Sequence, residues 1–397
     1  MRSGTMIRRF AVHYSMNANR RTRDWQMFAL FNASGAASNA ADRTNLPFRV
    51  HGHRFVFLDA LRGVAAIAVI FFHRKDMLPG NLFKHGYLAV DFFFMLSGFV
   101  IAYAYEDKLR SKMHLGDFVV KRLKRLMPLV VLGATLGLSI ETLRAFWKSD
   151  PALLHDAIIT FPFTAATLPS PRTQSFEAFG VNPVVWSLFF ELIANFVYAA
   201  IVRKLSNTLL ITIIAISGLA MVAIGFSFDS VEVGNKYSSL QFGLARVTFP
   251  FFFGVLLFRL RNVDMRALGG VSATLIAVSL AGILLAPVAT PGLNFMYDMA
   301  SVALVFPCLI YLGAQVQPFS GGASHVMEMA GNLSYAVYIL HFPLLGALHF
   351  PLTAISATTP VKFFVYLMVI LPFSYVATVF FDRPVQKLLN RPKALAS

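Results

Sequence analysis

The chain has 397 residues, of which 57% are hydrophobic and only 14% are charged; because charged residues make up about a quarter of a soluble domain, this composition excludes an ordinary soluble protein. Its formal net charge of +16 does not predict nucleic-acid binding, since the basic residues form short clusters between apolar runs. A single cysteine, Cys308, excludes an intramolecular disulfide and a cysteine-based zinc site.

Residues 1–54 are polar, rich in Arg, Ser, Asn and Ala, and poor in acidic residues. We expect these residues to form a disordered basic extension that is separate from the apolar part of the chain. An organelle transit peptide, or a start codon assigned too far upstream, would have the same composition. The first long apolar run begins near Val56 and is longer than the apolar region of a secretory signal.

Ten apolar runs follow that are long enough for a helix to cross a hydrocarbon core of about 30 Å, which takes roughly 20 residues. They cover 56–73, 86–104, 127–146, 184–202, 207–227, 242–260, 268–289, 296–316, 328–349 and 359–381. The sequence therefore predicts an all-α, polytopic integral membrane protein with about ten transmembrane helices in one bundle. We expect this membrane domain over 55–385 and a short basic cytoplasmic tail over 386–397.

Basic residues in short loops predict the orientation, because Lys and Arg are retained on the cytoplasmic side. With both termini in the cytoplasm, the loop 105–126 and the other strong basic clusters lie inside. Arg74 and Lys75 are the exception, because they follow the first span on the predicted outer side. The longest connection, 147–183, is also predicted to lie outside. It is either a plain loop or a segment that covers the binding site of an acceptor substrate.

The first span carries Arg62 and His73, eleven positions apart. Eleven helical steps of about 100° return to within about 20° of the starting direction and climb about 16 Å, so both side chains share one face at different depths. A guanidinium binds a phosphate or polarises a carbonyl, and a histidine removes a proton from a hydroxyl. The simpler alternative is an Arg that reaches the inner interface and pairs with Asp59, and a His that caps the helix.

The fourth span places Ser187, Glu191, Asn195 and Tyr198 at steps of four, four and three, which forms one polar stripe on an apolar helix. Such a stripe must face protein or water. We expect Glu191 at a depth similar to that of His73, where a carboxylate orients an imidazole. A carboxylate that only holds helices together is the alternative.

Other ionisable or polar residues also lie within the predicted spans. Asp91 and Arg246 should sit in the outer half, where pairing with each other is the simplest role. The ninth span buries His341 near the middle of the membrane, with Tyr335 and Tyr338 on the preceding turns. A neutral histidine hydrogen-bonded to a neighbour is the commoner explanation, and no histidine has the spacing of a metal site.

The segment KRLKRLMP places Arg122 and Arg125 one turn apart, with Lys121 and Lys124 beside them. Two guanidiniums at i and i+3 on the inner membrane surface form a clamp suited to the phosphates of a nucleotide-like donor. Ordinary positive charge that holds anionic lipid headgroups is the alternative. No phosphate-binding glycine loop accompanies the segment.

Taken in order, these segments resemble the acyltransferase-3 family, membrane acyltransferases that O-acetylate bacterial surface polysaccharides, lipopolysaccharide, Nod factors and some macrolides. The resemblance covers about 55–390. It rests on LDALRGVAAIAVIFFH for the Arg/Lys-x10-His motif, on GYLAVDFFFMLSGFVI, RLKR, WSLFFE and LSYAVYILH, and on the closing FFDRPVQKL.

The resemblance implies that His73 is the catalytic base, with Arg62 as its essential partner, and that Glu191 belongs to the catalytic site. Arg122 and Arg125 would contact the phosphates of acyl-CoA on the cytoplasmic side. The resemblance also implies that Trp186 and Ser187 belong to the core of the site, and His341 matches a family position. From their places in the spans we expect Asp59, Asp91, Tyr335, Tyr338 and His341 in the site core as well.

Two features depart from the family pattern. Asp382, Arg383 and Pro384 stand where the family usually has Glu-Arg-Pro, a change that should keep an ion pair. Many relatives also carry a fused periplasmic hydrolase-like domain, which is absent from these residues. The acceptor would then be acylated inside the membrane domain or with a separate extracytoplasmic partner.

The resemblance implies a multi-pass protein of a bacterial inner membrane that transfers an acyl group, expected to be acetyl, from cytoplasmic acyl-CoA to a hydroxyl of a carbohydrate acceptor. Acyl-CoA is a donor substrate here, and no permanently bound cofactor or metal is expected. His73 would either deprotonate the acceptor or carry the acyl group as an acyl-imidazole. The alternative class is a transporter or lipid-linked flippase, in which the same polar residues line a pathway.

Overall fold

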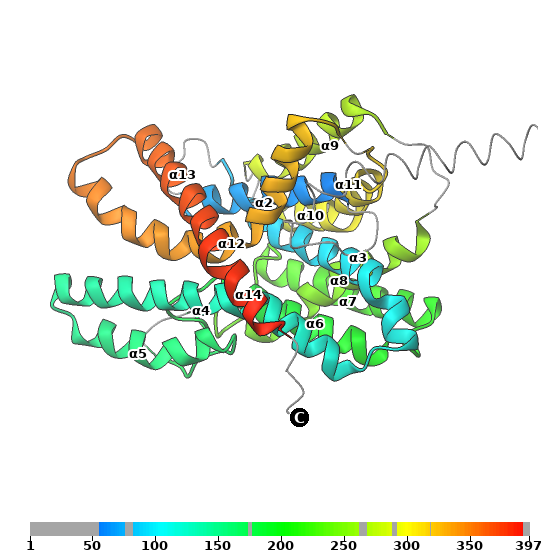
Figure 1. Ribbon diagram of the computed structural model, residues 1–397, viewed down its shortest axis with the longest axis horizontal. Coiled ribbons are helices and arrows are strands. Elements are labelled where there is room, and N and C mark those ends of the chain that lie inside the picture. Colours follow the sequence, from blue (N-terminus) through cyan, green and yellow to red (C-terminus); the bar gives the residue numbers. More distant parts are fainter. Residues whose placement is uncertain are drawn as a thin grey trace, which may run out of the picture. The chain divides into compact units, whose positions relative to one another are not determined.

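The computed structural model describes residues 55–75, 82–173, 177–261, 268–287, 292–317 and 319–391, and the predicted extension 1–54 lies outside them. The described residues are helical almost throughout (Figure 1). The helices are α2 (Val56–Phe72), α3 (Leu88–Ser111), α4 (Leu115–Lys148), α5 (Pro151–Ala165), α6 (Val185–Ile201), α7 (Asn207–Phe228), α8 (Gly243–Leu260), α9 (Gly270–Leu285), α10 (Asn294–Ala300), α11 (Phe306–Gly313), α12 (Gly322–Ala354), α13 (Thr359–Val376) and α14 (Arg383–Leu389).

A helix occupies each of the ten ranges that the sequence predicts to be apolar spans. Among the described residues, seven helices are long and apolar enough to cross a membrane, and α6 and α9 are shorter apolar helices. The first predicted span is α2, which has 17 residues. The protein is therefore an all-α, multi-pass integral membrane protein, as predicted.

The helices α3 and α8 pack in close contact through reciprocal glycines. A Cβ atom at Gly98 would lie 1.9 Å from the carbonyl oxygen of Phe251, and one at Gly254 would lie 1.9 Å from that of Met95. No other residue type fits such an approach, which is the usual way for helices in lipid to increase their packing contacts. The pair α3 and α8 thus forms the rigid centre around which the polar residues are arranged.

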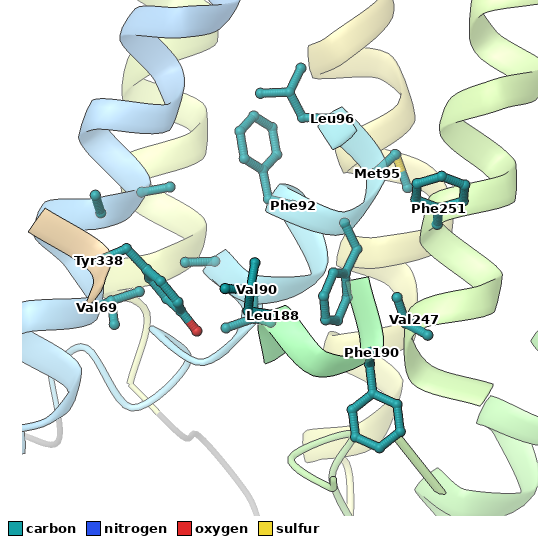
Figure 2. Close-up of a cluster of buried hydrophobic side chains, with 14 of the residues drawn as sticks. Val69, Val90, Phe92, Met95, Leu96, Leu188, Phe190, Val247, Phe251 and Tyr338 are labelled. Atoms are coloured by element: carbon teal, nitrogen blue, oxygen red, sulfur yellow. The ribbon is translucent and has the colours of Figure 1, made fainter. Parts of the chain in front are cut away.

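The long helix α12 lies against α2, α4 and α13 and brings the ninth-span motif next to the first. Figure 2 shows Tyr338 of α12 facing Val90 of α3 and Leu188 of α6, with Val69 of α2 beside it. These side chains belong to one continuous core of buried residues. The segments of the candidate site therefore come from α2, α3, α4, α6 and α12.

The sequence analysis predicts a loop over 105–126, between the second and third spans. The structure shows that most of this segment is helical instead. Helix α3 continues to Ser111 and α4 begins at Leu115, so the basic segment with Arg122 and Arg125 lies inside α4. At about 1.5 Å per residue, the 34 residues of α4 extend over about 51 Å, more than a hydrocarbon core requires. Its first turns can therefore carry charge beyond the apolar layer.

The connection 147–183 is likewise not a plain loop, because it contains α5, which lies side by side with α4 (Figure 1). Ser149 ends α4 in the left-handed conformation, with φ 50°. The carboxylate of Asp150 then accepts the backbone N–H groups of Ala152 and Leu153, and Pro151 opens α5. This sequence of cap and proline is a helix start signal.

Helix α13 continues through a π-helical segment, η5 (Ala377–Asp382), into α14, which contacts α4. Gln386 is buried in α14 and donates to the backbone oxygen of Arg125 at 3.3 Å. The first residues of the predicted tail, 386–397, are therefore part of the helical body. Residues 392–397 lie outside the described residues.

Candidate active site

Three guanidiniums line one pocket of about 240 Å³, which we call the arginine pocket. Arg62 comes from α2, and Arg122 and Arg125 come from successive turns of α4. Glu191 of α6 and Tyr335 of α12 complete its polar wall. The structure thus brings together the first-span arginine and the basic segment, as the nucleotide-donor interpretation requires.

Glu191 lines the arginine pocket, where its partners are Ser97 and Arg122 and not His73. Its Oε1 accepts a hydrogen bond from Ser97 at 2.6 Å and lies 3.3 Å from Nη2 of Arg122. The expectation that Glu191 orients His73 is therefore wrong. Glu191 lies about one and a half turns inside α6, whereas His73 caps the C-terminal end of α2.

Arg122 and Arg125 are held at their places by carboxylates. Nη1 of Arg125 lies 3.7 Å from the buried carboxylate of Asp382, whose two oxygens accept from Gln386 at 2.8 Å. The ion pair expected from the closing motif is therefore present, with Arg125 as its partner. Nε of Arg122 is buried and has no hydrogen-bond partner among the described residues, so this guanidinium is not fully hydrogen-bonded.

Arg62 lies at the rim of the same pocket and is partly exposed. Its Nη1 is 3.6 Å from Oδ1 of Asp59, one helical turn earlier. The pairing that the simpler interpretation predicts is therefore present. Because Arg62 also lines the arginine pocket, this weak ion pair does not exclude a contact between its guanidinium and a ligand.

His73 ends α2 and lies against α12. Its ring centroid is 5.1 Å from that of His341 and 5.2 Å from that of Phe342. His341 is fully buried, and its Nδ1 is 2.7 Å from the backbone oxygen of Tyr338. The other nitrogen, Nε2, is buried without a partner among the described residues, so the predicted buried histidine turns out to be the neighbour of His73.

His73 lines a second pocket, of about 310 Å³, which we call the histidine pocket. Trp186, Arg246 and Tyr338 also line it, together with Glu177 and Lys236 from the loops. His73 caps the C-terminal end of α2 and Arg62 lies eleven residues earlier, about 16 Å along the axis, so the two pockets lie at different depths of the bundle.

Tyr338 and Val90 line both pockets and form the partition between them. The hydroxyl oxygens of Tyr338 and Ser187 are 2.6 Å apart, and Ser187 lines the arginine pocket. Figure 2 shows the hydroxyl of Tyr338 at this junction, close to Val90 and Leu188. Two side chains and one hydrogen bond therefore separate the two pockets.

A buried ion pair fixes the wall of the histidine pocket. Arg246 of α8, which is 1% exposed, donates from Nε and Nη2 to the two oxygens of Asp91 at 3.1 and 2.8 Å. Its guanidinium carbon lies 5.1 Å from the ring centroid of Trp186. The predicted pairing of Asp91 and Arg246 is confirmed, and it positions Trp186 beside the pocket.

The loops contribute residues that sequence analysis missed. Glu177 and Lys236 meet across an isolated antiparallel bridge between two connecting segments, and both line the histidine pocket. Burial raises the pKa of Glu177, and the positive charge of nearby Lys236 partly offsets this increase. Both residues lie in connecting segments, where no helical periodicity predicts which side chains face inward. Their place beside the pocket is therefore known only from the structure.

A family model described as an acyltransferase domain matches residues 55–379. Protein 2 of the picA locus of Rhizobium radiobacter is 34% identical over 189 residues, which cover 44% of this chain and 96% of that protein. A protein of Staphylococcus aureus strain COL, provisionally named an O-acetyltransferase, is 26% identical over 320 residues, or 74% of this chain and 51% of its own length.

A protein of Acidianus two-tailed virus, provisionally named an acetyltransferase, is 23% identical over 299 residues, which cover 71% of this chain and 80% of that protein. This chain thus spans about half the length of the staphylococcal relative. No solved structure matches the chain.

Proposed function

This chain belongs to the acyltransferase-3 family, and from that premise we propose that it transfers an acetyl group from acetyl-CoA to a hydroxyl of a carbohydrate acceptor. The relatives named as acetyltransferases support the choice of acyl group. A cytoplasmic thioester and an extracytoplasmic glycan meet across a bacterial inner membrane, where we place the reaction.

The donor binds in the arginine pocket. Coenzyme A carries a diphosphate and a further phosphate, and guanidiniums are the side chains best suited to phosphate because they offer several donors in one plane. Each of the three guanidiniums has one carboxylate at 3.3 to 3.7 Å, from Asp59, Glu191 or Asp382. Among the described lining residues only Glu191 is acidic, so a bound donor would meet mainly cationic groups. Arg122 lines the pocket with a guanidinium that is not fully hydrogen-bonded, which favours a phosphate as a further partner.

The acceptor hydroxyl binds in the histidine pocket, beside His73. Glu177, Lys236 and Trp186 surround it with the mixture of polar and aromatic groups that sugars contact. His341 packs beside His73, with the two ring planes tilted by 38°. His73 is the candidate proton acceptor because it is the one histidine among the described residues that line this pocket.

The acyl group crosses the partition formed by Tyr338 and Val90. In direct transfer, His73 takes the proton of the acceptor hydroxyl, the hydroxyl oxygen forms a bond to the acyl carbon, and the carbon–sulfur bond breaks. CoA leaves as a thiolate and takes up a proton. In the two-step route, an imidazole nitrogen of His73 first carries the acyl group and then passes it to the acceptor.

The main supporting observation is that three guanidiniums line one pocket and His73 lines a second, and that Tyr338 and Val90 line both. A transporter would also have two pockets separated by a gate, and it is the second candidate for this reason. The two functions differ in chemistry, because a transporter moves its substrate without breaking a thioester.

Acetyl-CoA turnover by the purified protein in lipid nanodiscs tests the proposal, with release of free CoA followed in the presence and absence of a pooled polysaccharide acceptor. We expect CoA release by the wild type and at least a hundredfold lower release by His73→Ala, in line with the usual contribution of general-base catalysis of about 10² to 10⁴. Release that survives His73→Ala would exclude His73 as the base.

Single-turnover trapping without acceptor separates the two routes. Recovery of acyl-His73 indicates the two-step route, and its absence despite turnover indicates direct transfer. If no thioester is cleaved under any of these conditions, the transporter becomes the better account.

A further inference from the structure

The lateral side of His73 opens onto a groove that neither the arginine pocket nor the histidine pocket includes. This lateral groove, of about 580 Å³, runs between the C-terminal half of α4 and the second half of α12. Ile140, Leu143 and Trp147 line it from α4, and Phe342 and Leu345 line it from α12. Its wall is therefore mainly apolar, as a site for a hydrocarbon chain would be.

The groove is open to the surroundings of the bundle. Along its α4 edge, Leu143 is 68% exposed and Trp147 is 81% exposed. In a membrane such side chains face lipid, and tryptophan near the end of a helix is typical of the interface between hydrocarbon and water. A chain of lipid can thus enter the groove sideways without leaving the bilayer.

Charged side chains in the lining of the groove distinguish it from an ordinary lipid-facing surface. Arg74 and Arg144 line the groove, and Glu141 is the only carboxylate among the lining residues that the structure describes. Glu141 pairs with Arg144 at 3.3 Å, which leaves Arg74 as the excess cation.

Arg74 makes one weak contact, from Nη2 to the backbone oxygen of Leu345 at 3.4 Å. Its Nε is buried and has no partner among the described residues. The side chain as a whole is partly exposed, so its guanidinium can reach an anion in the groove, the partner that a guanidinium favours most. This also gives a role to Arg74, which lies on the predicted outer side against the usual distribution of basic residues.

From these contacts we infer that the lateral groove holds the acceptor as a phosphorylated membrane lipid, with its tail between α4 and α12, its phosphate on Arg74 and its glycan at His73. This inference rests on the proposed function and names its acceptor class. Bulk phospholipid is the competing occupant, but a bulk headgroup fixed beside His73 would block the acceptor.

Photolabelling of the full chain in nanodiscs of phosphatidylcholine tests the inference. The probe is a photoreactive polyisoprenyl phosphate, and the comparison probe is the same chain ending in a free alcohol. We expect the phosphate probe to label groove residues of α4 and α12, with about tenfold less labelling by the alcohol, because a charge-assisted hydrogen bond is lost. Equal labelling by the two probes would overturn the inference.

Matched variants localise the effect. Arg74→Gln should lower labelling about tenfold, whereas Lys148→Gln, an exposed lysine at the same end of α4 and outside the groove, should not change it. Gly346→Phe should abolish labelling, because a Cβ atom at Gly346 meets only Ile140, at an ordinary 3.6 Å, and the ring extends into the groove. Gly282→Phe, where a Cβ atom meets nothing within 4 Å, adds the same ring elsewhere as its control.

Two further arms separate the possible failures. Displacement of the probe by excess phosphatidylglycerol would identify a general anionic-lipid site and overturn the inference. His73→Ala should keep the labelling while transfer is lost. Turnover of acetyl-CoA without labelling of the groove would therefore overturn this inference alone, and labelling without turnover would overturn the acyltransfer proposal alone.

Discussion

At the scale of single residues, the ion pair of Asp91 and Arg246 has the clearest energetic consequence. Both side chains are essentially buried, and Arg246 also donates to the backbone oxygens of Val233 and Tyr87. Breaking a buried pair leaves one uncompensated charge, which typically costs about 3 to 5 kcal/mol. The pair therefore contributes to the stability of the fold as well as to the wall of the histidine pocket.

We predict that Asp91→Asn lowers the free energy of unfolding by about 3 to 5 kcal/mol, measured by denaturant titration in detergent micelles. The matched control is Asp107→Asn, which makes the same change at an exposed position of the same helix. An equal loss of stability in the two variants would show that the buried pair has no special role.

Spacing along one helix predicted some residues of the site well. The eleven-residue interval placed Arg62 and His73 on one face of α2, and the paired arginines of α4 reach the same pocket as Arg62. Glu191 could not be placed in this way, because its partner depends on the packing of α6 against α3 and α4. Ser97 and Arg122 lie on those helices, and no spacing within α6 indicates them.

At the scale of helices, the close contact of α3 and α8 determines where the polar side chains of both helices lie. We predict that Gly98→Ala strongly lowers the yield of folded protein, because the added Cβ atom would overlap the backbone of Phe251. Gly282→Ala is the matched control, since a Cβ atom there meets nothing within 4 Å. Size-exclusion chromatography in detergent measures both, and a normal elution profile for Gly98→Ala would contradict the packing.

Apolar runs predicted the positions of the helices but not their ends. The basic residues of 115–126 were interpreted as a loop because charge interrupts the hydrophobic pattern, although a helix can continue beyond the hydrocarbon core. Helix α5 was missed because Pro and Thr dominate the composition of its neighbourhood. Its start at Asp150 and Pro151 was nevertheless visible as a cap followed by proline.

At the scale of the whole molecule, the account requires the arginine pocket to face the cytoplasm and the histidine pocket to face outward. We predict that a membrane-impermeant maleimide labels Ser238→Cys on intact cells and labels Lys112→Cys only after lysis. Both residues are exposed: Lys112 follows the C-terminal end of α3, and Ser238 lies in the segment before α8. The background variant is Cys308→Ala, which removes the one native thiol. Labelling of Lys112→Cys on intact cells would show that the protein has the opposite orientation in the membrane.

The central claim is that donor binding and acyl transfer depend on different pockets. Titration calorimetry with a non-hydrolysable thioether of acetyl-CoA tests this most directly, with the protein in nanodiscs as wild type, Arg122→Gln, Lys121→Gln and His73→Ala. Lys121 is exposed on the same helix and lies outside the arginine pocket, so it controls for net charge.

We predict that Arg122→Gln weakens binding about tenfold or more, because a charge-assisted contact to phosphate is lost. Lys121→Gln and His73→Ala should bind as the wild type does, although His73→Ala no longer transfers the acyl group. Equal weakening by Arg122→Gln and Lys121→Gln, or loss of donor binding in His73→Ala, would contradict the assignment of donor and acceptor to separate pockets.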